Sequence, residues 1–370
     1  MGCAIAWALS RRGARVRVLE RFSHVHAMGS HGGFTRVIRH AYYEGEDYVP
    51  LIDEADAAFE ALGERFGQRL LVRSGLLEFG ALDDPLYRDS CRSLELHQVP
   101  HERVDAQEAM RRWPIVIPPD WQACLSPRSG YLRVKGCMDA MKAEAEAAGA
   151  VFEYGVHVRE VVRGAPDLRV LVDEGKVIAC DRVVVCAGAY GAALIPGLAR
   201  ASSRGRLVAW RRVLAWTMPA PEHREALREL PVWGAMTPEG FFYGFPFHDE
   251  GVEGFKLACH VTQRLDGLNE PVDPEVVRRE LLPDDLSVLD AFLESYLPSA
   301  RGPLVHHAVC MYGQSIDGDF VVDLDPRDER VCLALGFSGH GFKFAPVIGE
   351  LVTDLLENGE SQRQRERFRL

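Results

Sequence analysis

The sequence has no long apolar run, no paired cysteines and no excess of positive charge. No apolar stretch approaches the roughly 20 residues that cross a bilayer, so no membrane-spanning helix is expected. The nine cysteines are scattered, without a C-x-x-C pair or the spacing of a metal site, which favours buried thiols in a reducing compartment. The net charge of −11 argues against nucleic acid or an anionic membrane as a partner. We therefore expect a cytoplasmic protein that binds no metal, nucleic acid or membrane.

Signals for secretion and for hydrolytic catalysis are missing as well. Residues 2–9 are apolar, but Arg11 and Arg12 follow this run instead of preceding it, which is the wrong order for a secretory leader. There is no Gly-x-Ser-x-Gly motif that would carry a nucleophilic serine. The chain of 370 residues, with 47% apolar and 26% charged residues, exceeds the usual size of a single core. Two domains are therefore expected.

The N-terminal region contains half of a dinucleotide-binding motif. Gly2 to Arg12 is predicted to be a helix, and the strand that follows it ends in Glu20. An acidic residue at this point of a Rossmann fold, about 20 residues after a glycine-rich turn, binds a ribose hydroxyl. The first strand and the first two glycines of the motif do not precede Gly2. The alternative is an ordinary helix–strand pair with an exposed glutamate.

The segment Gly29–Tyr42 places Arg36 and Arg39 among apolar residues. If this segment is helical, residues three apart share a face, and both guanidinium groups point into one site. Such a planar, permanently charged group suits a carboxylate that is held by two hydrogen bonds. The alternative is a solvated or ion-paired basic stretch.

Two further glycine turns follow predicted strands. The strand in Asp181–Ala193 runs into Gly188, which would allow close backbone approach to a ligand, although a plain junction explains it equally well. The turn Gly336–Phe344 opens a predicted helix, and its free N–H groups could hold a phosphate or stabilise negative charge on a reduced flavin. Lys343 adds a cation there; the alternative is a tight turn with an exposed lysine. Taken alone, Cys310 is interpreted as a buried structural thiol.

Together these stretches resemble the monomeric sarcosine oxidase and N-methyltryptophan oxidase family of flavin amine oxidases. The resemblance extends from Gly2 to about Leu356, and six motifs occur in the family's order. They are G-S-H-x-G-x-T-R-x-I-R-H-A-Y at Gly29–Tyr42, Y-V-P-L at Tyr48–Leu51, Y-G-F-P at Tyr243–Pro246, K-L-x-x-H at Lys256–His260, A-V-C-M-Y at Ala308–Tyr312, and G-F-S-G-H-G-F-K-F at Gly336–Phe344.

The resemblance implies a bound FAD, attached covalently to Cys310 as a thioether to the flavin ring. Glu20 would bind the adenosine ribose, and Arg36 would lie on the face of the flavin where oxygen reacts. The other residues implied in cofactor binding are Gly2, Thr35, Gly188, Gly339, His340, Gly341 and Lys343.

The same resemblance implies roles in substrate binding and catalysis. Arg39 and Lys343 would hold the substrate carboxylate, in agreement with the interpretation of the arginine segment. Lys256 would be the site at which oxygen is reduced. The residues implied around the reacting amine are His260, Tyr243 and Tyr312, with Arg36 nearby.

The implied fold is an α/β Rossmann-like FAD domain interleaved with an antiparallel-sheet substrate domain, with the first Rossmann strand missing. We expect residues 1–70, 136–203 and 313–370 in the FAD domain, and residues 71–135 and 204–312 in the substrate domain. For the missing strand, either the true start lies upstream of Met1 or the chain is a damaged relative, and we favour the first explanation.

The implied reaction is oxidation of a secondary amino acid to an imine, which water hydrolyses, while O2 is reduced to H2O2. The substrate could be sarcosine, N-methyltryptophan, pipecolate or another N-alkyl or cyclic amino acid, and the protein is expected to be a monomer. Gly32 and Phe34 replace a His and an Asp of the family pattern and leave the substrate open. Two alternatives remain, an inactive flavin-binding relative and a dehydrogenase that passes electrons to a partner. Lys256 argues against the dehydrogenase.

Overall fold

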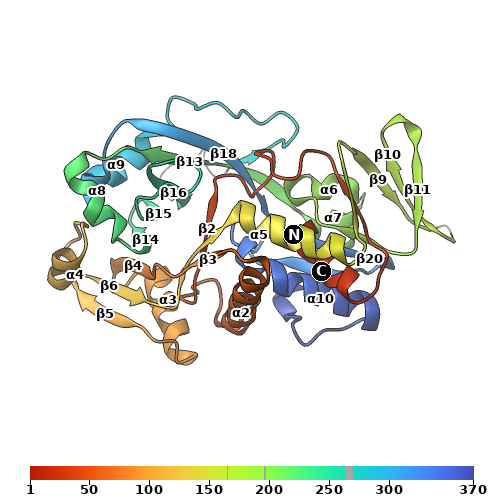
Figure 1. The fold of residues 1–370 in the computed structure, drawn as a ribbon, viewed down its shortest axis with the longest axis horizontal. Coiled ribbons are helices and arrows are strands. Elements are labelled where there is room, and N and C mark those ends of the chain that lie inside the picture. The colour runs from red at the N-terminus through yellow and green to blue at the C-terminus, as the bar shows by residue number, and fades with distance from the viewer. Residues whose placement is uncertain (165, 196, 263–269) are drawn as a thin grey trace.

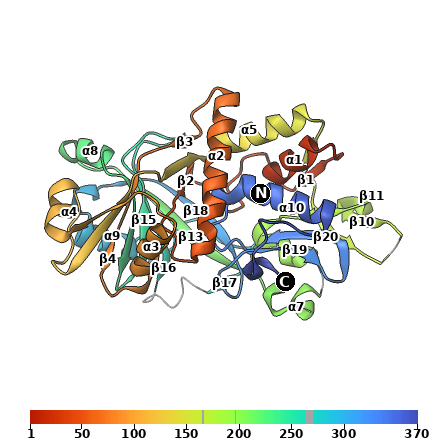
Figure 2. The same ribbon diagram turned by 90° about the horizontal axis from the view of Figure 1, so that it is seen from below.

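A large sheet occupies one end of the molecule, and smaller sheets together with both termini lie toward the other (Figure 1). This arrangement is seen in a computed structural model that describes residues 1–164, 166–195, 197–262 and 270–370. Helix α2 (Val49–Phe66) stands between the two ends and packs on α5 (Val134–Ala147) and α10 (Ala345–Asn358) (Figure 2).

The end that carries the termini is built on short parallel strands. Helix α1 (Gly2–Arg11) packs against α10, where Gly349 leaves room for it: a Cβ at that position would lie 2.6 Å from the Ala4 carbonyl oxygen. Strand β1 (Arg17–Glu20) pairs in parallel with β8 (Val151–Tyr154).

A second sheet on this side is separate from the first. Strand β12 (Val183–Val185) pairs in parallel with β20 (Asp328–Leu335), which pairs in antiparallel fashion with β19 (Val321–Asp325). No strand of the described residues joins β1 to β12 or β20. The predicted α/β fold is confirmed, and apolar side chains of β1 and β12 line a common cavity.

A three-stranded antiparallel flap projects from the same side (Figure 1). It consists of β9 (Val158–Val162), β10 (Leu168–Val172) and β11 (Val177–Cys180). Two short helices, α6 (Gly191–Leu194) and α7 (Leu198–Ala201), follow β12.

The large sheet contains nine described strands and is mostly antiparallel. Its outer face is buried under helices, and Trp233 and Phe242 of the sheet stack on Phe292 of α9. Its strands are β4 (Leu76–Ala81), β5 (Glu102–Asp105), β6 (Trp121–Ser126), β13 (Val208–Thr217), β14 (Val232–Thr237), β15 (Gly240–Gly244), β16 (Phe255–Thr262), β17 (Pro271–Val272) and β18 (Leu304–Gln314), and the helices on this side are α3 (Pro85–Leu96), α4 (Ala106–Arg112), α8 (Pro221–Arg228) and α9 (Ser287–Tyr296).

The arginine segment is not helical. Thr35–Ile38 forms strand β2, which pairs with β7 (Gly130–Arg133), and β7 also pairs with β3 (Leu71–Val72). The β-branched residues Thr35, Val37 and Ile38 suit the pleated conformation of a strand. The helical conformation that would have placed Arg36 and Arg39 on one face was therefore wrong.

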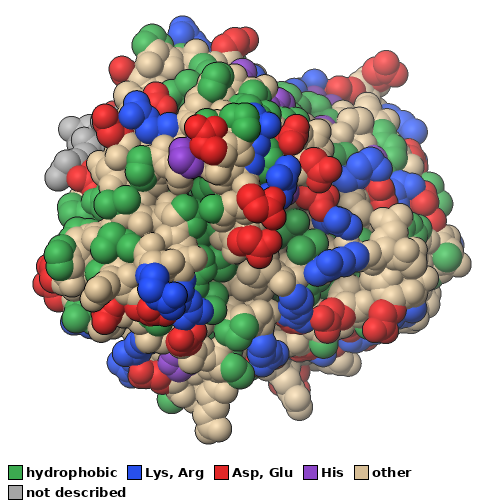
Figure 3. Space-filling view, turned by 60° about the vertical axis from the view of Figure 1, so that its left-hand side comes forward, with side chains coloured by type: hydrophobic (Ala, Val, Ile, Leu, Met, Phe, Trp, Pro, Cys, Tyr) green, Lys and Arg blue, Asp and Glu red, His purple; other side chains and the backbone are tan. Residues whose placement is uncertain are grey.

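The surface carries both signs of charge, and Figure 3 shows acidic and basic side chains interspersed over one face. No helix among the described residues is long and apolar enough to span a membrane. The two-domain division given above remains a proposal; its ranges include positions 165, 196 and 263–269, which lie outside the described residues.

Candidate active site

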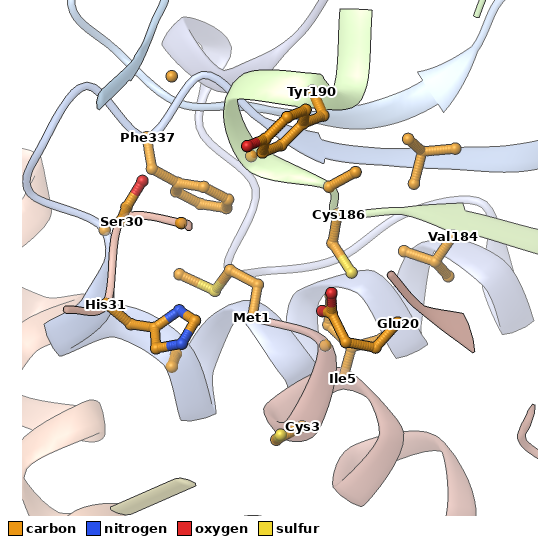
Figure 4. Close-up of a pocket in the computed structure, with 18 of the residues that line it drawn as sticks. Met1, Cys3, Ile5, Glu20, Ser30, His31, Val184, Cys186, Tyr190 and Phe337 are labelled. Carbon is orange, nitrogen blue, oxygen red and sulfur yellow. The ribbon is translucent and has the colours of Figure 1, made fainter. Parts of the chain in front are cut away.

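One cavity of about 1590 Å³ connects the two ends of the molecule. It runs from the start of α1 and the end of β1, past the β12 junction, to the inner face of the large sheet. Figure 4 shows the Cys186 sulfur and the Glu20 carboxylate turned toward one another at one part of it, with Met1 beside them. Of the predicted site residues, Thr35 and Lys256 do not line it but are hydrogen-bonded to each other. Those that line it are Gly2, Glu20, Arg36, Arg39, Gly188, Tyr243, His260, Cys310, Tyr312, Gly339, His340, Gly341 and Lys343.

Cys310 sits on β18, the longest strand of the large sheet, and lines the cavity although only 2% of it is exposed. The backbone on both sides of it is fixed: Arg279 donates to the Val309 carbonyl at 2.9 Å, and the Ser30 hydroxyl donates to the Met311 carbonyl. Burial raises the pKa of the thiol. A cysteine held this rigidly can attach a flat ring in one fixed orientation.

Two basic side chains, Arg36 and Lys256, lie near Cys310. Arg36 donates to the carbonyls of Thr35 at 2.8 Å and Ser30 at 2.6 Å. Lys256, 1% exposed, donates from Nζ to the Gly33 carbonyl at 2.7 Å and to the Thr35 carbonyl at 2.9 Å. Burial, followed by the charge of Arg36, lowers the pKa of Lys256. Among the described residues, neither side chain forms an ion pair with a carboxylate, and both donate mainly to backbone carbonyl groups.

Arg39 lies just beyond the end of β2, and its guanidinium is held rather than free. It donates to Glu44 Oε2 at 2.7 Å and to the Ala41 carbonyl at 2.6 Å, and it stacks over the Tyr42 ring at 4.2 Å. Burial alone would raise the pKa of Glu44, but the charge and hydrogen bonds of Arg39, together with the nearby His340 and Lys343, lower that pKa to about 2. The sequence analysis did not identify Glu44. An acid five residues after a predicted carboxylate-binding arginine is the signal that could have done so.

The glycine turn before α10 places His340 and Lys343 at the cavity. Tyr42 donates its hydroxyl to His340 Nδ1 at 2.6 Å, because His340 Nε2 must donate to the Gly318 carbonyl at 3.1 Å. Burial lowers the pKa of His340 to about 4, so the ring is neutral near pH 7. Lys343 donates to the His340 carbonyl at 2.9 Å, and burial followed by the charge of Arg39 lowers its pKa.

Gly339 in this turn cannot be replaced without movement. Its φ is +83°, a conformation that favours glycine, and a Cβ there would lie 2.4 Å from a ring carbon of Tyr312. The turn backbone and the Tyr312 ring are therefore in direct contact.

An aromatic wall surrounds His260 on β16. His260 Nδ1 lies 3.1 Å from the Tyr312 hydroxyl, and its ring lies 5.6 Å from Phe241 and 6.4 Å from Tyr243. Burial lowers the pKa of His260 to about 3. The structure brings Tyr243, His260 and Tyr312, which the sequence analysis grouped, to the same part of the cavity.

At the other end of the cavity, Glu20 is positioned by its own turn. Its Oε1 accepts from the Phe22 N–H at 2.9 Å and lies 3.7 Å from His26 Nε2. Burial raises the pKa of Glu20, but these groups together lower it, so an anionic hydrogen-bond acceptor faces the cavity. Gly2, at the start of α1, also lines the cavity, and a Cβ there would lie 3.6 Å from the Cys186 sulfur, an ordinary contact distance.

These residues fit FAD. The cavity is continuous from a carboxylate of the kind that binds ribose to a thiol and a glycine turn of the kind that meets a flavin ring. Gly188, with φ +56° and open space where a Cβ would point, leaves the backbone accessible between them.

One further cavity residue was absent from our predictions. Glu78 of β4 is 2% exposed, and its Oε1 is buried without a hydrogen-bond partner among the described residues. Burial raises its pKa to about 8. Its sequence context, Leu76 to Gly80, indicated only a strand.

Comparisons with known proteins agree with this geometry. The family model for "FAD dependent oxidoreductase" matches residues 1–355. The monomeric sarcosine oxidase of Bacillus sp. (strain B-0618) is 31% identical over 366 residues, which cover 98% of this chain and 91% of the relative. The N-methyl-L-tryptophan oxidase of Salmonella arizonae is 32% identical over 356 residues, with 96% and 91% covered.

A similar solved structure is that of NikD, an unusual amino acid oxidase essential for nikkomycin biosynthesis. It superposes with a TM-score of 0.81 at 26% identity and covers 99% of this chain and 94% of that one. The chain belongs to the family of FAD dependent oxidoreductases. Within that family it is a flavin-dependent amine oxidase of the type formed by the monomeric sarcosine and N-methyltryptophan oxidases.

Proposed function

We propose that this protein oxidises a secondary amino acid, N-alkylated or cyclic, to an imine that water hydrolyses, with O2 reduced to H2O2. The observation that carries the proposal is that Arg39 and Lys343, which suit a carboxylate, line the same cavity as Cys310, His260 and Tyr312. Cofactor, carboxylate and amine sites thus meet in one buried space.

FAD, when bound, supplies the acceptor for the two electrons of the substrate C–H bond. We propose that it is attached covalently through Cys310 and that Glu20, Gly2 and Gly188 hold its adenosine and linking parts. The turn at Gly339–Gly341 and the side chain of Arg36, with Thr35 behind it, would border the ring. The support is that Cys310 is fixed on both sides by hydrogen bonds.

The residues of the chain would bind and orient the substrate. Its carboxylate would compete with Glu44 for the guanidinium of Arg39, and Lys343 would supply a second donor. Binding would therefore loosen the Arg39–Glu44 pair, which holds the arginine in place beforehand.

Arg36, Lys256 and His260 would favour the neutral, reactive form of the amine. An ammonium group must lose its proton before oxidation, and burial beside the cations Arg36 and Lys256 makes this loss easier. His260 is neutral near pH 7, so it can accept a hydrogen bond without adding charge. The aromatic wall excludes water from the reacting carbon.

A dehydrogenase that passes electrons to a protein partner is the second candidate. Lys256 favours the oxidase. A buried cation without a carboxylate partner lowers the free-energy cost of the negative charge that forms as oxygen is reduced. An inactive flavin-binding relative is the third candidate.

One experiment separates these three functions. The purified holoenzyme is mixed in air with sarcosine, N-methyltryptophan and pipecolate in turn, and the H2O2 released is measured. Peroxide release supports the oxidase. Reduction of an artificial electron acceptor without peroxide supports the dehydrogenase, and neither signal supports the inactive relative. Flavin that stays with acid-precipitated protein, and is released in Cys310→Ser, tests the covalent bond.

A further inference from the structure

Glu78 is a buried acid in the cavity wall that the proposed reaction does not use. It extends from β4 at a point where β14 carries Gly234, and a Cβ on Gly234 would lie 3.4 Å from Glu78 Cγ and 3.0 Å from the ring of Phe241. The lack of a side chain at Gly234 therefore gives Glu78 and Phe241 their room.

Glu78 lies within reach of the amine site. Phe241 contacts the His260 ring at 5.6 Å and the Tyr43 ring at 5.4 Å, and Tyr43 in turn stacks on Arg39 at 4.8 Å. One aromatic ring, Phe241, thus separates Glu78 from His260. A substrate side chain that passes along this ring would end at the carboxyl group.

The charges around Glu78 leave it without a counter-ion. Arg39 is a basic group that acts on Glu78, but its Nη2 donates to both carboxylate oxygens of Glu44 and its Nη1 donates to the Ala41 carbonyl. The other titratable neighbours are Glu44, Tyr43 and the thiols of Cys91 on α3 and Cys124, the β6 residue opposite Glu78. A lone carboxylate in such surroundings is costly unless a ligand supplies the opposite charge.

We propose that Glu78 determines substrate specificity by binding an ammonium or other N–H donor at the end of the substrate side chain. This inference rests on the proposed function. The substrate class would be N-alkyl α-amino acids with a basic side chain, whose carboxylate is held by Arg39 and Lys343 and whose distal nitrogen pairs with Glu78. Such a ligand adds one negative and one positive charge to a cavity that has a partner for each.

The test uses a nearly isosteric pair of substrates, Nα-methyl-L-ornithine and Nα-methyl-L-norleucine, and the ratio of their kcat/KM values. A ratio within one enzyme is insensitive to losses of folded protein. We expect the holoenzyme to favour the ornithine derivative by ~10-fold or more, and Glu78→Leu to shift the ratio by ~100-fold toward norleucine. Glu78→Gln should fall between them. In the control variant Glu44→Gln, both substrates should change together.

The outcomes separate the two proposals. If the holoenzyme oxidises secondary amino acids but Glu78→Leu leaves the ratio unchanged, the specificity role is wrong and the oxidase is retained. If no secondary amino acid is oxidised, the proposed function itself fails.

A measurement without turnover tests the same residue. A buried acid with a raised pKa stabilises the fold below its unfolded pKa, and this contribution is lost as the pH rises through its folded pKa. The melting temperature of the wild-type holoenzyme should therefore fall relative to that of Glu78→Gln between about pH 5 and about pH 9. Parallel curves would overturn the premise that Glu78 lacks a counter-ion.

Discussion

At the scale of single residues, the site is defined by which charges have partners. Arg39 has Glu44, whereas Arg36 and Lys256 bond mainly to carbonyl groups. When a cation is already paired, a substrate carboxylate can take the place of its partner. A cation without a carboxylate partner continues to attract negative charge during the reaction.

The Arg39–Glu44 pair gives the first prediction. Arg39→Met leaves Glu44 as a buried carboxylate without its arginine, so we expect a loss of about 3–5 kcal/mol in the free energy of unfolding. The double variant Arg39→Met/Glu44→Gln should recover more than half of this loss, because no charge is then left alone. Denaturant unfolding measures both values. A double variant no more stable than Arg39→Met would contradict the pairing.

Glu44 also predicts an acid-dependent loss of stability. Its folded pKa of about 2 is below the unfolded value, so its contribution is present above about pH 4 and disappears as the pH falls toward about 2. The full contribution is about 3 kcal/mol. Unfolding measured across this range should show a steeper decline for wild type than for Glu44→Gln. Equal slopes would show that the carboxyl group is not held by Arg39.

Lys256 gives a prediction about oxygen. Lys256→Met keeps the length of the side chain but removes the cation, and it leaves the carbonyls of Gly33 and Thr35 without this donor. We expect reduction by substrate under anaerobic conditions to persist and reoxidation by O2 to slow by ~100-fold or more. Stopped-flow absorbance follows both half-reactions. Unchanged reoxidation would rule out the role proposed for Lys256.

At the scale of elements, the glycine turn before α10 is where backbone conformation and the site are most tightly joined. Gly339→Ala should lower the melting temperature and the flavin content, because the new methyl group collides with the Tyr312 ring. Gly155→Ala is the matched control: its φ of +72° is similar, but nothing lies within 4 Å, so we expect a cost of only about 1 kcal/mol and normal flavin content. Equal flavin losses in both variants would mean that backbone strain, not the collision, is responsible.

Element types followed from the sequence where the pattern was long and regular. Helix α10 begins directly after the turn Gly336–Phe344, and strand β1 ends in Glu20, as predicted. The segment Thr35–Ile38 was considered as part of a helix, and it is a strand. The helical interpretation rested only on the spacing of two arginines. Arg36 and Arg39 reach one cavity from a strand because the chain turns after Ile38, and spacing alone contains no information about that turn.

Glu44 and Glu78 show what pattern reasoning could not supply. Neither belongs to a motif, and each becomes notable only through what packs around it: Glu44 through Arg39, and Glu78 through the absence of a partner. Such information is carried by contacts between segments far apart in the chain, Glu78 with Gly234 being one example. The six motifs, by contrast, contain ten of the thirteen predicted residues that line the cavity, because each motif combines a recognisable pattern with chemically active side chains.

At the scale of the whole molecule, the cavity joins two parts that could not form the site separately. The end with both termini supplies Glu20, Gly2 and the glycine turn, and the large sheet supplies Cys310, Tyr243 and His260. A flavin spanning this cavity would contact both, so cofactor binding and the relative position of the two parts should be coupled.

The central claim is that a secondary amino acid delivers electrons to FAD in this cavity. The most direct measurement is the visible spectrum of the purified holoenzyme, mixed with sarcosine or another N-methyl amino acid without oxygen and then exposed to air. The account predicts that the flavin absorption disappears on mixing and returns in air, with one H2O2 released for each flavin. Flavin absorption that no secondary amino acid changes, or a protein that holds no flavin, would contradict it.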